Sequence, residues 1–165
     1  MWMPFSELPD AARIWLYQTD RPLTDSEIPY VQQVLDEQVA RWAAHGQPLT
    51  GSARVLHGRF VVLAVDETQH GPSGCSIDAS THWFKELGAQ LGLSFFDRSV
   101  AYLDEVGTVR TLPVAGVKAA VAAGEIRPDT RVFNPLVPTL GAWRRDGQVP
   151  AAQSWLKRYF QPQTA

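Results

Sequence analysis

The chain has 165 residues, of which 45% are hydrophobic and 19% charged, so it can bury a core as one domain or as two small ones. Its net charge is −2 with acids and bases interspersed, which argues against a nucleic-acid surface. The single cysteine excludes an internal disulfide, and no apolar run approaches the roughly 18 residues that cross a bilayer. The N-terminus shows no signal-peptide pattern, so we expect a cytoplasmic protein without membrane insertion.

A strand and a long helix are expected first. Residues 12–17 alternate between two faces, which is typical of a strand. Thr24 and Glu27 have the spacing of a capping box, which predicts the beginning of a helix. Apolar residues then recur at steps of three and four, and we expect Gly46 to end this helix.

A hairpin and a second helix follow. Residues 54–57 and 60–65 predict two strands that turn at Gly58, and the second strand is apolar enough to be central in a sheet. The next helix carries apolar residues on one face. These are Trp83, Phe84, Leu87 and Leu91. The order strand, helix, strand, strand, helix predicts an α+β fold in which helices cover a mostly antiparallel sheet, with a ferredoxin-like tendency if a strand after Phe95 joins the sheet.

The last third of the sequence has shorter apolar segments separated by turn residues, and this pattern predicts a second, small α+β unit. Two strands are expected to turn at Gly107, a short alanine-rich helix to stop at Gly124, and a turn at Pro128 to precede a further strand. Pro150 can begin a final helix. We therefore divide the chain into residues 1–97 and residues 98–165.

This final third is similar to GYF-type domains of the compact bacterial sort, over residues 100–152. The matching residues are Tyr102, Gly107, Pro113, Val114, Gly124, Glu125, Ile126, Asp129, Thr130, Val132, Trp143, Pro150 and Ala151. The resemblance implies recognition of proline-rich peptides by aromatic side chains, with Tyr102, Phe133 and Trp143 as the candidate binding surface. The Gly-Tyr-Phe cluster that names the family does not occur in this sequence, so the fold can be shared without the groove.

The whole chain also resembles a family of uncharacterised bacterial soluble proteins. The marks are residues 14–17, 73–78, 96–98, 132–134 and 154–155. Members are often labelled ABC transporter ATPases, but a phosphate-cradling loop requires a Gly-Lys pair and none occurs here. Nor is there a Gly-x-Gly-x-x-Gly pattern for a dinucleotide. We therefore expect no ATPase activity and no cofactor.

Cys75 is the residue with the strongest chemical claim to reactivity. It lies where the second long helix should begin, and the positive end of a helix dipole favours a thiolate. With Ser76 as the N-cap, the thiol would lie just outside the first turn. Asp78 and His82 are four residues apart on one helix face, so Asp78 could orient the imidazole as a base. The simpler interpretation, a small cysteine beside an ordinary helix cap, explains the same residues.

Two other kinds of site are conceivable at the same loop. Gly74 and the amide of Ser76 could approach an anion, although the loop glycines could equally serve positive φ angles. A metal site is disfavoured because the acidic, histidine and cysteine residues nearby lack ligand spacing. Trp42, Trp83 and Trp155 are expected in cores, whereas Trp143 is expected in a loop as an anchor for a partner or as a plug of the C-terminal core.

Two functional hypotheses result. The first is a non-catalytic binding or adaptor protein that recognises a protein segment, such as a proline-rich peptide, through its C-terminal aromatic residues. The alternative is a small cysteine-dependent enzyme or redox-responsive protein that uses Cys75.

Overall fold

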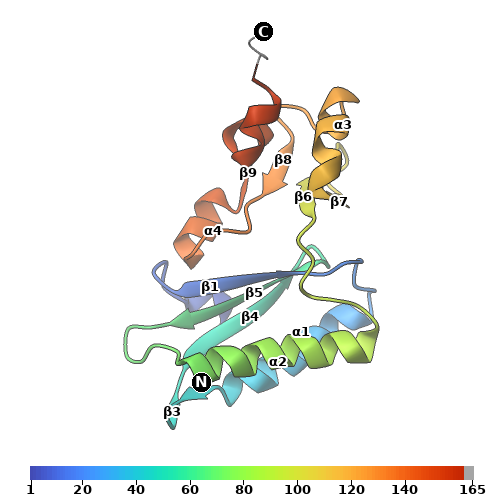
Figure 1. Ribbon diagram of the computed structural model, residues 1–165. Coiled ribbons are helices and arrows are strands. Elements are labelled where there is room, and N and C mark those ends of the chain that lie inside the picture. Colours follow the sequence, from blue (N-terminus) through green and yellow to red (C-terminus); the bar gives the residue numbers. More distant parts are fainter. Residues whose placement is uncertain (162–165) are drawn as a thin grey trace. The chain divides into compact units, whose positions relative to one another are not determined.

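The structure is a computed structural model that describes residues 1–161, and it is a mixed α+β fold (Figure 1). The chain divides into two compact units. The first contains Met1–Asp97 together with Pro138–Ala142, and the second contains Arg98–Val137 and the residues from Trp143 onward. No helix within residues 1–161 combines the length and the apolar character that a membrane span requires.

The first unit contains a three-stranded antiparallel sheet in the order β1-β5-β4. The central position predicted for the apolar strand is confirmed, because every side chain from Phe60 to Val65 is fully buried. The hairpin turn at Gly58 is also confirmed, since this residue has a φ of +60°. The first strand of the hairpin, predicted over residues 54–57, begins earlier than predicted, at Thr50. The strands are β1 (Arg13–Gln18), β4 (Thr50–Leu56) and β5 (Phe60–Asp66).

Helices α1 (Glu27–Ala40) and α2 (Gly74–Leu91) cover one face of this sheet (Figure 1). The predicted capping box is present, because Thr24 and Glu27 exchange backbone-to-side-chain hydrogen bonds of 2.9 and 3.2 Å. The apolar stripes of both helices pack with the sheet into one core. Its members include Val31, Leu35, Val39, Trp42, Leu63, Phe84 and Leu87.

The prediction that α1 ends at Gly46 is wrong, because the helix ends at Ala40. The following residues form a small hairpin of β2 (Ala43–Ala44) and β3 (Gln47–Pro48). Its turn requires two left-handed residues, His45 with a φ of +51° and Gly46 with a φ of +76°. The glycine thus serves a strand turn and not a helix end.

The sheet follows the ferredoxin-like order through three strands and then departs from it. The chain after α2 reaches the free edge of β1, where the Gln18 amide donates to the Phe95 oxygen at 3.1 Å and the Asp97 amide donates to the Gln18 oxygen at 3.0 Å. This is an isolated parallel bridge between Gln18 and Phe96. A ferredoxin-like fourth strand would instead run antiparallel to β1, so the condition set for a complete ferredoxin-like sheet is not met.

The other end of the same β1 edge is occupied by residues Pro138–Ala142. The Ile14 amide donates to the Pro138 oxygen at 3.1 Å, and the Leu140 amide donates to the Ala12 oxygen at 2.9 Å. Gly141 approaches Asp10 so closely that an added Cβ would lie 2.8 Å from the Asp10 Cβ. This segment, where α4 (Leu140–Asp146) begins, is therefore built into the first unit.

The second unit is built on a four-stranded antiparallel sheet in the order β7-β6-β8-β9. The predicted hairpin is confirmed, with Gly107 in its turn at a φ of +83°. The short helix is also confirmed, and Gly124 follows it in the left-handed conformation with a φ of +77°. The elements are β6 (Val100–Leu103), β7 (Val109–Leu112), η2 (Val114–Gly116), α3 (Val117–Ala122), β8 (Arg131–Phe133) and β9 (Gln148–Pro150).

A separate apolar cluster forms the core of this unit. Its members are Val100, Tyr102, Val117, Ala120, Ile126, Val132, Ala151 and Leu156. The final helix expected from Pro150 is wrong, because two short 3-10 turns replace it, η3 (Ala151–Gln153) and η4 (Trp155–Tyr159). Ser154 separates them, since its extended backbone ends the first turn and its hydroxyl caps the second. In this geometry Trp155 is 44% exposed and not in the core as predicted.

Candidate functional site

The start of α2 differs from the prediction in the identity of its N-cap residue. Ser73, and not Ser76, is the N-cap. Its side chain accepts from the Ser76 amide at 3.1 Å, and the Ser76 hydroxyl accepts from the Ser73 amide at 2.7 Å. This reciprocal capping box fixes Ser76 as the third helical residue and buries it. Cys75 consequently lies inside the first turn, where its thiol is exposed.

The other residues proposed beside Cys75 do not form a site with it. Cys75, Asp78 and His82 are all exposed on α2, and no hydrogen bond or ion pair joins any two of them. Gly74 does not have the positive φ that the simpler interpretation assigned to it. Within residues 1–161 no group of three or more His, Cys, Asp or Glu side chains could hold a metal ion.

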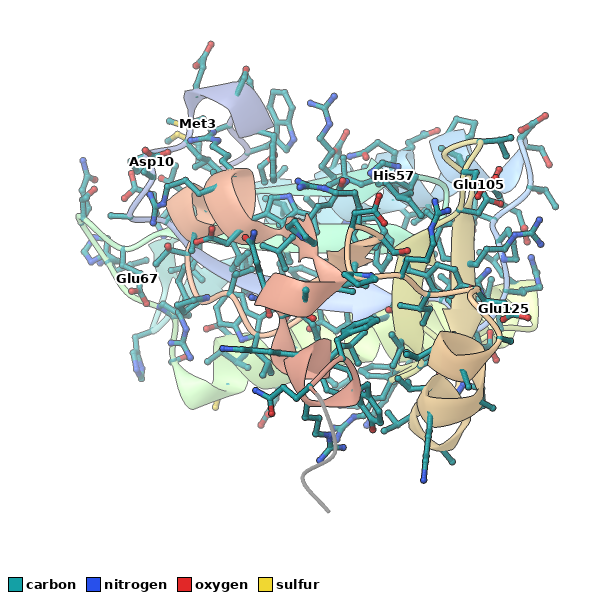
Figure 2. The ribbon with its side chains drawn as sticks, turned by 90° about the horizontal axis from the view of Figure 1, so that it is seen from above. Met3, Asp10, His57, Glu67, Glu105 and Glu125 are labelled. Carbon is teal, nitrogen blue, oxygen red and sulfur yellow. The ribbon has the colours of Figure 1, made fainter. Side chains whose placement is uncertain are left out.

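A hollow of about 690 Å³ lies within the second unit and brings together charged residues from three segments of the chain. The segments are the end of β6 with the turn to β7, the residues after α3, and the turn before β8. Figure 2 labels one acidic residue from each of the first two, Glu105 and Glu125. The lining residues are Tyr102, Leu103, Asp104, Glu105, Gly107, Arg110, Gly124, Glu125, Arg127, Asp129, Thr130 and Arg131.

Asp104 organises the turn between β6 and β7. One of its carboxylate oxygens accepts from the amides of Val106 and Thr108 at 3.0 and 2.8 Å, and the other accepts from the Arg110 Nε at 3.0 Å. The hydrogen bond from Thr108, followed by that from Arg110, holds the pKa of Asp104 below its ordinary value. The carboxylate of Asp104 is therefore already paired within the turn.

The remaining arginines of the hollow also have partners. Arg127 lies 3.4 Å from the carboxylate of Glu105 and 3.7 Å from that of Asp129. Arg131 donates to the backbone oxygen of Gln148 at 3.0 Å. These exposed contacts hold the rim of the hollow and contribute little to stability individually.

Tyr102 is the aromatic residue of the hollow. It lies in β6 opposite Arg110 of β7 and Val132 of β8, and its ring is packed in the core of the second unit. The residue is 8% exposed, and its hydroxyl makes no hydrogen bond to the described residues. Burial, followed by the negative charge of Glu125, raises the pKa of Tyr102, so the phenol stays neutral and able to donate and accept at physiological pH.

The three aromatic residues of the predicted binding surface do not form one surface. Tyr102 lines the hollow, whereas Phe133 is buried at 4% exposure. Trp143 is half-buried in α4 and not in a loop, and an added Cβ at Gly147 would lie 2.7 Å from its ring. Sequence reasoning missed the charged lining, for which the alternating acids and arginines between residues 104 and 131 were the available signal.

No protein-family model, curated protein or solved structure matches this chain.

Proposed function

We propose that this chain is a binding protein, and that the hollow of the second unit receives a segment of a partner protein. The observation that carries this proposal is Tyr102, a buried aromatic residue that lines a hollow together with charged groups and whose hydroxyl makes no hydrogen bond to residues 1–161. Aromatic residues with one apolar and one polar end are frequent anchors in protein recognition. A hydroxyl that no protein group contacts can exchange its hydrogen bond to water for one to a ligand.

The size and composition of the hollow also favour a peptide segment. A volume of about 690 Å³ falls within the range of small-ligand sites, but the rim is formed by exposed, charged side chains. Such a rim suits the polar and charged groups of a peptide. The alternative built on Cys75 has no comparable support, because the thiol is exposed on a helix with no imidazole paired to it.

The proposal is tested by titrating the full-length, ¹⁵N-labelled protein with a panel of proline-rich peptides and following amide chemical shifts. We expect shifts confined to residues 102–110 and 124–131. Tyr102→Phe keeps the ring and removes the hydroxyl, so it should weaken binding about tenfold, the value of one hydrogen bond to a charged or polar group. Trp143→Phe is the matched control, because it changes an aromatic residue of the same unit outside the hollow.

Shifts that cluster elsewhere, or equal losses of affinity in the two variants, would refute the assignment of the hollow as the binding site. Absence of shifts with every peptide would refute recognition of this peptide class.

A further inference from the structure

The charges that line the hollow are not equally available to a ligand. Asp104 is paired with Arg110, and Arg127 is paired with Glu105 and Asp129. Glu125 differs from these groups, since its exposed carboxylate makes no hydrogen bond or ion pair with the described residues. Arg131 donates to a backbone oxygen and forms no ion pair within residues 1–161, so Glu125 is the lining carboxylate left without an arginine partner, and the four acids and three arginines of the lining give it a net negative charge.

The position of Glu125 is fixed by its backbone. At the end of α3 the Gly124 amide donates to the Val121 oxygen at 3.1 Å, and the Glu125 amide donates to the Ala120 oxygen at 2.9 Å. These two bonds, with Gly124 at a φ of +77°, form a Schellman motif. The motif holds the Cα of Glu125 at the edge of the hollow while its carboxylate remains free.

A second acceptor belongs to the same hollow. Tyr102 lines the hollow together with Glu125, and its hydroxyl makes no hydrogen bond to residues 1–161. The negative charge of Glu125 adds to the effect of burial in raising the pKa of Tyr102. The lining contains four acidic residues and three arginines, so a cationic group also restores charge balance. A planar guanidinium has five N–H donors and can reach two acceptors on different segments, which a compact ammonium does less well.

We propose that the hollow selects protein segments carrying an arginine, whose guanidinium pairs with the Glu125 carboxylate and donates to the Tyr102 hydroxyl. This inference rests on the proposed function and specifies its ligand.

The test uses three otherwise identical proline-rich peptides with a central arginine, citrulline or lysine, titrated into the full-length protein. Citrulline has nearly the shape of arginine but no charge. We expect the arginine peptide to bind about fivefold more tightly than the citrulline peptide, the upper range for an exposed ion pair, and lysine to lie between them. This preference should weaken as salt is added.

Glu125→Gln removes the charge and keeps the shape, and it should bring the arginine and citrulline peptides to equal affinity. Glu86→Gln is the matched control: Glu86 is exposed on α2 in the first unit, so the same change in net charge should leave the preference intact.

Two outcomes would overturn the inference in distinguishable ways. If all three peptides bind the hollow equally, the arginine selection is wrong and the proposed binding function stands. If none of them perturbs the residues of the hollow, the proposed function fails together with the inference. Loss of the arginine preference in Glu86→Gln would show that net charge, and not Glu125, produced it.

Discussion

Replacing Gly88 by alanine separates local helix propensity from packing. Gly88 lies within α2, where propensity alone makes alanine more stable than glycine by about 1 kcal/mol. The structure predicts the opposite result, because an added Cβ would lie 2.6 Å from the backbone oxygen of Leu93. That oxygen cannot easily move, since the Leu93 amide donates to the Gly88 oxygen at 3.0 Å.

The magnitude follows from three contributions. Overpacking a tight site costs about 1–3 kcal/mol, and weakening the Leu93–Gly88 hydrogen bond costs about 1 kcal/mol more. Helix propensity offsets about 1 kcal/mol of this loss. We therefore expect Gly88→Ala to lower the free energy of unfolding by about 1–3 kcal/mol. The free energy of unfolding is measured by urea denaturation monitored by far-ultraviolet circular dichroism. This signal is suitable because α1 and α2, with 14 and 18 residues, contribute most of the helical signal.

Gly74→Ala is the matched control in the same helix. Gly74 is the first helical residue, its φ is not positive, and nothing lies within 4 Å of an added Cβ. The Gly74→Ala substitution should change the free energy of unfolding by no more than about 0.5 kcal/mol. A Gly88→Ala protein as stable as the Gly74→Ala protein, or more stable than the parent, would refute the reasoning from close approach.

Four further predictions concern residues of the first unit. Phe84→Ala should lower the free energy of unfolding by about 3–5 kcal/mol, because the ring is fully buried; a loss below about 1 kcal/mol in urea denaturation would contradict that burial. The pKa of Glu27 should be about 2 by NMR titration, chiefly because Glu27 accepts hydrogen bonds from Arg21. The stability that the ionised Glu27 contributes is present above pH 4.5, the ordinary pKa of this carboxyl, and is lost as the pH falls towards 2. Ser73→Ala should cost about 1 kcal/mol through loss of the N-cap, whereas Cys75→Ser should change stability by less than about 0.5 kcal/mol and leave peptide binding unaltered.

The elements that sequence reasoning predicted best are those with strong periodicity. The apolar stripe of α1, the continuous apolar run of β5 and the glycine turns at Gly58 and Gly107 each define their structure locally. Errors arose where one residue type serves two structures. Gly46 has the left-handed conformation common at helix ends but occurs in a hairpin turn. Ser76 is of a residue type that often caps helices, but here it is the third helical residue and completes a capping box with Ser73.

The candidate site was predictable only in part. The sequence predicts Tyr102 as a binding residue, and this residue lines the hollow. The charged lining was not predicted, because it is assembled from a hairpin turn, a helix end and a pre-strand turn whose proximity depends on how β6 and β8 pair. Burial of Phe133 and exposure of Trp155 likewise depend on tertiary packing that aromatic identity does not specify.

The segment Pro138–Ala142 makes the first unit discontinuous in sequence, and this affects when that unit can complete its fold during synthesis. When Asp97 has left the ribosome, Ile14 and Ala12 still lack the backbone partners that Pro138 and Leu140 supply. The first unit therefore reaches its final form only after some forty further residues, including most of the second sheet, have been synthesised. A gene fragment that stops at Asp97 would encode an unfinished fold with an open strand edge prone to aggregation.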